Sequence, residues 1–199
     1  MKQLSLRSVF CRLFLATCLT SSLPAASPVA TPPKEIAVGD PAPKFVLKDQ
    51  NDAEFSLEEM TKKGPVAVVF VRSVEWCVYC QLQTMQLGAN LDEIQSGGGR
   101  VVVVTYDTPE KIKRFAKRRK LKLPILSDAD SKTIDAYAMR AVQLVSGDQI
   151  GSAQHGSFVI DRKGIVRSKP YLTSFEDRSA IDALVTALKE ASQPNPESK

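Results

Sequence analysis

The chain has 199 residues, four cysteines and a formal net charge of +5. A chain of this length can bury a good hydrophobic core in a single domain, so it does not need disulfide staples for stability. Much of the basic excess lies in residues 111–122, whose basic face carries no interleaved aromatic side chains for stacking on bases. The charge therefore gives no argument for a nucleic-acid partner.

Residues 1–26 have the order of a secretory signal peptide, because basic residues are followed by an apolar run and a small-residue end. Residues 27–38 are rich in proline and small residues and are predicted to form a linker. We therefore expect an exported protein, periplasmic or otherwise extracytoplasmic. It would contact a membrane only through an uncleaved N-terminal anchor or a lipid on Cys18.

The first half of the domain is predicted to alternate strands with one helix. Residues 44–57 should form a hairpin, because two short apolar segments flank a polar turn segment. Residues 65–71, the β-branched run PVAVVFV, predict a strand buried on both faces. A helix should follow from about Cys77 to Gln95, and after the glycines at 97–99 a second buried strand is predicted at 101–107.

The next segments continue the alternation. A helix is expected over residues 108–118, and residues 123–128 predict a short strand. Residues 130–140 should form a helix, for which Asp130 or Ser131 would supply the N-cap.

The C-terminal part closes the fold. Residues 156–161 and 164–172 predict two strands joined by the turn DRKG, and residues 174–191 predict the last helix. The tail, 192–199, should be frayed. This order of elements predicts an α/β domain over residues 39–191, with a mixed central β-sheet flanked by helices.

The basic segment 111–122 is predicted to be one face of an amphipathic helix. Ile112, Phe115 and Ala116 recur at helical spacing, so the basic side chains should point outward. A solvated face is the simplest interpretation, and attraction to an anionic partner or membrane surface is the alternative.

The sequence WCVYC contains the pair most relevant to function. Signal cleavage would remove Cys11 and Cys18, which leaves Cys77 and Cys80. Unpaired N–H groups and the dipole at a helix N-terminus favour an anion, so Cys77 is expected to be an exposed, acidic thiol. Cys80 would lie one turn deeper on the same face, placed to attack a bond formed on Cys77. The placement favours a reactive thiol pair.

Other uses of paired cysteines fit less well. A zinc site would need a second CxxC or a histidine pair, and the chain has one histidine. Haem attachment would need a histidine after Cys80, where Gln81 stands. We expect no cofactor, and an inert pair remains as the alternative to a reactive one.

Four segments together resemble the alkyl hydroperoxide reductase/thiol-specific antioxidant (AhpC/TSA) family: VGDPAPKFVL, VAVVFVRSVEWCVYCQLQ, LPILSDADSKTIDAYAM and GSFVIDRKGIVR. The pattern WCxYC in particular is similar to peroxiredoxin-like members that carry a CxxC. The resemblance implies a thioredoxin-like fold and an antioxidant oxidoreductase. It implies that Cys77 attacks a peroxide or a protein disulfide and that Cys80 resolves the product to a Cys77–Cys80 disulfide. An external thiol, thioredoxin-like or small, would be the reductant.

The chain departs from the family pattern around the pair. Peroxiredoxins carry a proline seven residues and a threonine or serine three residues before the attacking cysteine, where this chain has Phe70 and Val74. Ser73 is the neighbouring hydroxyl that could substitute. Arg72 is expected to support the thiolate by its charge, and Trp76 to cover the sulfur atoms as an apolar lid.

His155 is the only histidine, and the resemblance places it beside the CxxC, where the family has its second arginine. The same residues permit an alternative function. The Sco family of copper chaperones has two cysteines and one distant histidine on this fold, so Cys77, Cys80 and His155 could bind copper. The Sco motif has one more residue between its cysteines, so a thiol redox enzyme is the preferred prediction.

Overall fold

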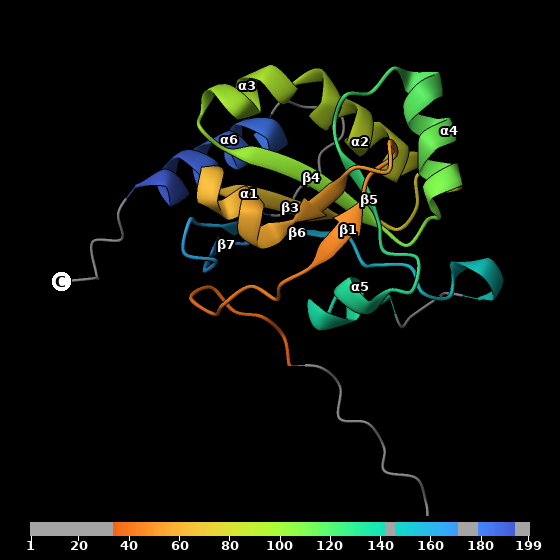
Figure 1. The fold of residues 1–199 in the computed structure, drawn as a ribbon, viewed down its shortest axis with the longest axis horizontal. Helices are drawn as coiled ribbons and strands as arrows, with labels where there is room; N and C mark the ends of the chain where they lie inside the picture. Colours follow the sequence, from red (N-terminus) through yellow and green to blue (C-terminus); the bar gives the residue numbers. More distant parts are fainter. Residues whose placement is uncertain (1–33, 142–145, 171–178, 194–199) are drawn as a thin grey trace, which may run out of the picture. The chain divides into compact units, whose positions relative to one another are not determined.

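The computed structural model of the chain describes residues 34–141, 146–170 and 179–193. In this part of the chain, strands form one mixed sheet in the order β2-β1-β5-β4-β3-β6-β7 (Figure 1). The strands are β1 (Val46–Lys48), β2 (Glu54–Ser56), β3 (Val66–Phe70), β4 (Arg100–Thr105), β5 (Ile125–Ser127), β6 (Gly156–Ile160) and β7 (Val166–Ser168). Each predicted strand is present, with bounds that differ by a few residues.

The centre of the sheet is the pair β3 and β4. These strands are parallel, from Val66 opposite Arg100 to Phe70 opposite Val104. β5 continues the parallel pairing, whereas β6 lies antiparallel to β3 on the other side. Every residue of β3 is buried, because helices or loops cover both faces of the sheet. The two predicted hairpins, β1–β2 and β6–β7, are both antiparallel pairs.

The helices are α1 (Leu57–Lys63), α2 (Val78–Ala89), α3 (Leu91–Ser96), α4 (Pro109–Arg119), α5 (Lys132–Ala136) and α6 (Ser179–Ser192), with a 3-10 turn η1 (Gly147–Gln149). One core layer packs α2, α3, α4 and α6 against one face of the sheet. The other layer packs α1, α5 and the first described segment against the opposite face. Successive residues of β3 alternate between these layers, as a pleated strand requires. The predicted α/β fold is confirmed.

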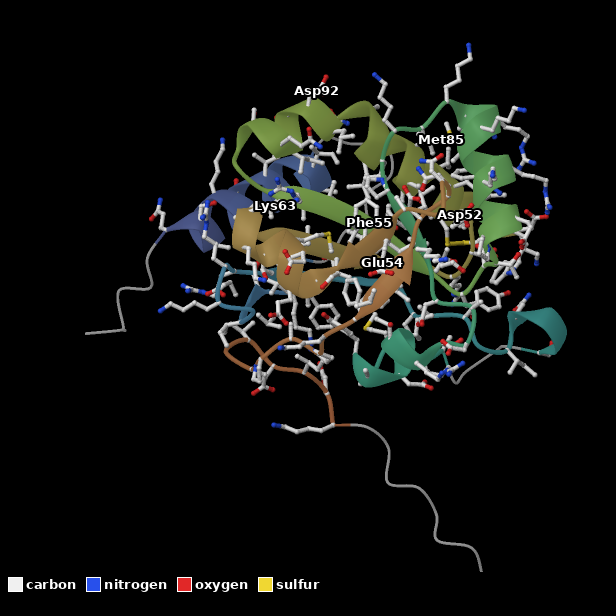
Figure 2. The ribbon with its side chains drawn as sticks, in the orientation of Figure 1. Asp52, Glu54, Phe55, Lys63, Met85 and Asp92 are labelled. Carbon is white, nitrogen blue, oxygen red and sulfur yellow. A yellow bond between two sulfur atoms is a disulfide. The ribbon has the colours of Figure 1, made fainter. Side chains whose placement is uncertain are left out.

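Most charged side chains lie on the outside of these layers, although a few aspartates, including Asp107 and Asp128, are buried. Exposed examples labelled in Figure 2 are Asp52, Glu54, Lys63 and Asp92. In α4, Ile112, Phe115 and Ala116 are buried, and the lysines and arginines of its last turn are exposed. The predicted amphipathic helix with an outward basic face is therefore confirmed.

The prediction of one helix from Cys77 to Gln95 is wrong. α2 ends at Ala89 and α3 begins at Leu91, with Asn90 between them at φ −107° and ψ 18°. The Asn90 side-chain amide donates to the carbonyl oxygen of Gln86 at 2.8 Å. The Gln86 carbonyl oxygen thus accepts from both the side-chain amide and the backbone N–H of Asn90, and asparagine favours such local bonds at helix ends.

The predicted N-cap of α5 is correct in position, because Ser131 is the N-cap residue. Its hydroxyl, however, donates to a loop carbonyl, and Asp130 Oδ1 accepts from the Lys132 backbone N–H at 3.4 Å. Asp128, which directly follows β5, accepts hydrogen bonds from the backbone N–H groups of Thr133 at 3.1 Å and Ile134 at 2.7 Å. The end of the preceding strand therefore supplies most of the side-chain capping, which the sequence did not indicate.

The ordered contacts begin before residue 39. Ile36 is buried, and Lys169 Nζ binds the Glu35 carboxylate at 2.7 Å and the Ile36 carbonyl oxygen at 3.0 Å. The predicted signal peptide, residues 1–26, and most of the predicted linker lie outside the described residues. Across the described ranges, no helix combines the length and the apolar composition that crossing a bilayer requires.

Candidate active site

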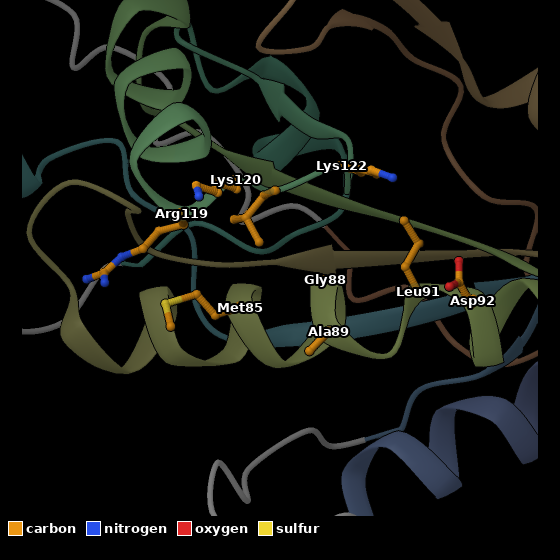
Figure 3. Close-up of a pocket in the computed structure, with 9 residues that line it drawn as sticks. Met85, Gly88, Ala89, Leu91, Asp92, Arg119, Lys120 and Lys122 are labelled. Carbon is orange, nitrogen blue, oxygen red and sulfur yellow. The ribbon is translucent and has the colours of Figure 1, made fainter.

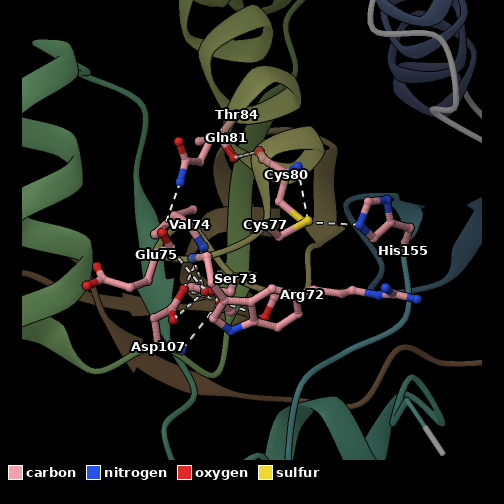
Figure 4. Close-up of a disulfide and its surroundings, with 12 residues drawn as sticks. Arg72, Ser73, Val74, Glu75, Cys77, Cys80, Gln81, Thr84, Asp107 and His155 are labelled. Atoms are coloured by element: carbon pink, nitrogen blue, oxygen red, sulfur yellow. Dashed lines mark hydrogen bonds between the residues drawn. A yellow bond between two sulfur atoms is a disulfide. The ribbon is translucent and has the colours of Figure 1, made fainter. Parts of the chain in front are cut away.

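Cys77 lies at the N-cap position of α2, after the loop that follows β3. Its backbone is extended, with φ −92° and ψ 101°, as is usual for a residue just outside the first helical turn. The backbone N–H of Cys80 donates to Cys77 Sγ at 3.3 Å (Figure 4). An otherwise unpaired N–H of the first turn thus points at the sulfur. The predicted placement of Cys77 at a helix start is confirmed.

Cys77 and Cys80 are joined by a disulfide, with their Cα atoms 5.2 Å apart. Both belong to the core layer beneath α2, but 9% of the Cys77 surface is exposed and none of the Cys80 surface. Cys77 is thus nearly buried, not exposed as predicted, but an incoming group still reaches it before Cys80. This difference in exposure is the one that an attacking and a resolving thiol require.

His155 is brought to the pair by the sheet. It directly precedes β6, whose first residue Gly156 lies opposite Phe70 at the end of β3. His155 Nε2 lies 3.1 Å from Cys80 Sγ (Figure 4). Burial lowers the pKa of His155, and the positive charge of Arg72 lowers it further, so the neutral imidazole is favoured. The expectation that His155 lies beside the CxxC is confirmed.

Arg72 and Ser73 both lie in the loop after β3 but have different surroundings. Arg72 is exposed, and Figure 4 shows its guanidinium group extending past His155. Ser73 is fully buried, and its hydroxyl donates to Asp107 Oδ1 at 2.8 Å. The same hydroxyl oxygen accepts from the backbone N–H groups two and three residues further on. Through these hydrogen bonds Ser73 shapes the loop that leads to Cys77.

Trp76 is half-buried and packs against the core layer that holds both cysteines. Its indole N–H donates to the hydroxyl oxygen of Tyr106, just after β4, at 2.8 Å. Glu75 forms an ion pair with Arg114 of α4 at 3.1 Å, which ties the basic helix to the same loop. Trp76 is therefore tied to the end of β4, and its role as an apolar cover of the sulfur atoms stays a prediction.

Tyr106 and Asp107 were missed by sequence reasoning. Both directly follow β4, at the same edge of the sheet as the loop after β3. Their side chains contact that loop, through Trp76 and Ser73 respectively. Their position was the available clue, because the carboxyl ends of neighbouring parallel strands meet at one edge and commonly build sites there.

The donor atoms of Cys77, Cys80 and His155 all lie within 4.8 Å of one another. Two sulfur atoms and an imidazole nitrogen suit a soft metal ion better than magnesium or calcium. Because thiolates are the ligands, such an ion could bind only after reduction of the disulfide.

A surface cavity of about 340 Å³ lies between α2 and the end of α4 (Figure 3). Its lining includes Met85 and Leu91 together with the cations Arg119, Lys120 and Lys122. The cavity lies along the second half of α2, and no cysteine or histidine is among its described lining residues. The redox pair and this cavity therefore occupy opposite ends of the helix.

Known proteins resemble this chain over most of its length. The AhpC/TSA family model matches residues 38–169. Peroxiredoxin Bcp of Escherichia coli (strain K12) is 28% identical over 155 residues, which cover 78% of this chain and 97% of the relative. The chloroplastic peroxiredoxin Q of Populus jackii is 28% identical over 187 residues, which cover 93% of this chain and 84% of the relative.

Solved structures share the fold. Peroxidoxin BcpB from Mycobacterium tuberculosis has a TM-score of 0.66 at 21% identity, with 78% of this chain and 98% of that chain covered. A peroxiredoxin-like protein from Aquifex aeolicus has a TM-score of 0.67 at 22% identity, with 80% and 90% covered. At these identities the likeness shows the fold alone, and this fold is the predicted thioredoxin-like one. Because the family model matches more than half of the 199 residues, the chain belongs to the AhpC/TSA family and is, as predicted, an oxidoreductase.

Proposed function

We propose that the chain is a thiol-dependent peroxidase in which Cys77 attacks the peroxide and Cys80 resolves the product. The observation that carries the proposal is the N–H of Cys80 directed at Cys77 Sγ at the start of α2. The same hydrogen bond and the helix dipole would stabilise a thiolate, which is the reactive form. A fall in the thiol pKa from about 8.5 to about 6.5 would raise the ionised fraction at pH 7 from about 3% to about three quarters.

The reaction has two steps at the sulfur of Cys77. The thiolate attacks one peroxide oxygen, so an S–O bond forms, the O–O bond breaks, and the other oxygen leaves as an alcohol or water after taking a proton. Cys80 then attacks the sulfenic acid, so the S–S bond forms and the hydroxyl leaves as water with the Cys80 proton. Two electrons from external thiols return the disulfide to two thiols.

His155 supports the second step in this proposal. Cys80 is fully buried, so its thiol proton needs an acceptor within the protein. His155 Nε2, at 3.1 Å from Cys80 Sγ, is within reach to take that proton and deliver it to the leaving hydroxyl.

Different observations support the two proposed partners, which are the substrate and the reductant. Both relatives described above are named peroxiredoxins, which supports a peroxide rather than a protein disulfide as the substrate. Val78, Tyr79 and Leu82, on the first turns of α2, are exposed apolar side chains close to Cys77 in sequence. An apolar surface there favours a protein thiol as the reductant over a small charged thiol.

We infer that the enzyme is exported, because residues 1–26 have the composition of a signal peptide. Fractionation of bacteria that express the full chain, with N-terminal sequencing, tests this. A periplasmic product that begins near residue 27 supports export. A full-length product in the cytoplasm overturns it.

Stopped-flow oxidation of the reduced protein by peroxide tests the peroxidase, with Trp76, the only tryptophan, as the fluorescent reporter. We expect a second-order rate constant far above that of a free thiol, and loss of the fast phase in Cys77→Ser. A wild-type rate equal to that of a free thiol, or an unchanged rate in the variant, contradicts the proposal.

A second candidate function is copper binding by the reduced protein. The observation that favours it is the proximity of the donor atoms of Cys77, Cys80 and His155. Two thiolates and one imidazole form a three-ligand set that suits Cu(I). A bound ion would occupy both thiolates and so prevent the reaction with peroxide.

Anaerobic titration of the reduced protein with Cu(I), against a competing chelator, tests this function. We expect one ion per chain and weaker binding in His155→Ala. Absence of stoichiometric binding, or equal affinity in the variant, overturns it.

A further inference from the structure

The carboxylate of Asp107 is the centre of a buried polar cluster beside the site. Asp107 is 2% exposed, and Ser73 and Val74 have no exposed surface. Oδ1 accepts from the Ser73 hydroxyl at 2.8 Å, and Oδ2 accepts from the Val74 backbone N–H at 2.6 Å (Figure 4). Oδ2 also accepts from the Thr105 hydroxyl at 2.9 Å. Both carboxylate oxygens are thus used as acceptors.

Ser73 extends the influence of this carboxylate along the loop. Because its hydroxyl proton is directed at Asp107, the lone pairs of its oxygen face the following backbone. They accept from the N–H of Glu75 at 2.9 Å and of Trp76 at 3.3 Å. The N–H groups of three consecutive residues, 74–76, are therefore held by one carboxylate, directly or through one hydroxyl.

These three residues are the last before Cys77. The loop has no regular secondary structure, so its backbone N–H groups lack the partners that a helix or strand would supply. Its conformation decides how Cys77 enters α2 and whether its sulfur faces the N–H of Cys80.

We propose that Asp107 is a positioning residue of the peroxidase reaction, which holds the sulfur of Cys77 at the start of α2 through the loop 73–76. This inference rests on the proposed function. It adds a residue that acts on the cysteines only indirectly, through the loop 73–76. Asp107 acts on the rate through Cys77, not through the stability of the fold alone.

Asp107→Asn is the informative substitution. The asparagine side chain has nearly the same shape, but it places an NH₂ group, a donor, where a carboxylate oxygen accepted. If that group faces the Val74 N–H, two donors meet and the contact is lost. If it faces the Ser73 hydroxyl, the Ser73 oxygen must accept from it, in competition with the N–H groups of Glu75 and Trp76. A loop displaced by about 1 Å should slow the reaction with peroxide by between about tenfold and a hundredfold.

The measurements are made on the reduced, folded protein. The first is the pH dependence of Cys77 alkylation by iodoacetamide, whose midpoint should rise by about one unit when the sulfur leaves the helix N-terminus. The second is the rate constant with hydrogen peroxide. Thermal unfolding is followed in parallel, so that a loss of stability is separated from a change at the sulfur.

Asp128→Asn is the matched control. Asp128 also directly follows a parallel strand, is buried and accepts two backbone N–H bonds, but these belong to the N-terminus of α5. We expect this variant to lose stability with an unchanged alkylation midpoint and rate. If Asp128→Asn changes the alkylation midpoint and the rate constant as much as Asp107→Asn does, both changes result from a general loss of stability and the inference fails.

Ser73→Ala is a second variant. It keeps the hydrogen bond that the Val74 N–H donates to Asp107, and it removes the hydroxyl that links Asp107 to the N–H groups of residues 75 and 76. We expect the alkylation midpoint and the rate constant to change in the same direction as in Asp107→Asn, but by less. If Asp107→Asn does not fold, this variant provides the test. If the wild type reacts fast and the variants have the same alkylation midpoint and the same rate constant as the wild type, the inference about Asp107 fails and the proposed function stands. A wild type with an ordinary thiol midpoint and no fast reaction overturns the proposed function.

Discussion

The indole N–H of Trp76 donates to the hydroxyl oxygen of Tyr106 at 2.8 Å, and this bond joins the residue before Cys77 to the end of β4. The next residue, Asp107, binds the same loop through Ser73 and Val74. Two consecutive residues after β4 therefore support the loop that leads to Cys77. The end of β4 contributes to the site although it carries neither cysteine.

Tyr106→Phe removes the acceptor of this bond and leaves the aromatic ring in place. Trp76 is half-buried, so water can replace part of the lost hydrogen bond. We expect the free energy of unfolding to fall by about 1 kcal/mol. Urea denaturation followed by Trp76 fluorescence measures this, and an unchanged transition midpoint would show that the bond does not contribute to stability.

Cys80→Ser should stop the reaction at its first product. Cys77 is the less buried of the two cysteines and the proposed nucleophile, so one equivalent of peroxide should leave a sulfenic acid on it that a dimedone probe traps. The wild type should give the disulfide and little trapped adduct. Cys77→Ser serves as the control, and an adduct on Cys80 in that variant, formed at the wild-type rate, would reverse the assigned roles.

The fold could be predicted because its main signals are local in the sequence. The valine-rich runs of β3 and β4 are buried on both faces, and the spacing of Ile112 and Phe115 gives the inward side of α4. The position of the cysteine pair could be predicted for the same reason, since Cys77 lies after the loop that follows a buried strand and precedes the first residue of a helix. Each of these inferences needs only a short window of residues.

The parts that were missed depend on contacts between distant segments. Asp107 contacts Ser73 across 34 residues of sequence, and Asp128 caps a helix that two nearer polar residues could equally have capped. Asn90 interrupts a helical pattern through its own side chain, against an otherwise continuous apolar periodicity. Side-chain hydrogen bonds of this kind do not produce a periodic pattern of residues in the sequence. For Asp107 and Asp128, the available clue is that each lies just after a strand.

Replacement of Cys77 separates its role as a helix cap from its proposed role as a nucleophile. Its Sγ accepts the N–H of Cys80 from the N-cap position, where serine is a favoured residue and alanine is not. Both Cys77→Ser and Cys77→Ala lack the disulfide and should fail to react with peroxide. We expect Cys77→Ser to be more stable than Cys77→Ala by about 1 kcal/mol in urea denaturation. Equal stabilities would show that the N–H contact at this position has no energetic role.

Asp128 gives the stability of the protein a pH dependence of defined sign. Burial raises the pKa of the Asp128 carboxyl, against the lowering effect of the hydrogen bonds from Ile134 and Thr133. Between its unfolded pKa and this raised value, the folded state binds more protons than the unfolded state does. Stability from this group is therefore fully present below the unfolded pKa and is lost as the pH rises through the folded pKa.

We therefore expect the wild type to gain stability relative to Asp128→Asn as the pH is lowered from about 7 to about 4. The substitution removes the one titrating group, so the effects of the other carboxylates cancel in the difference between the two proteins. Urea denaturation of both at several pH values measures that difference. A constant difference would show that the two N–H donors offset the effect of burial on the carboxyl. A wild type that loses stability relative to the variant as the pH falls would show that the N–H donors outweigh burial.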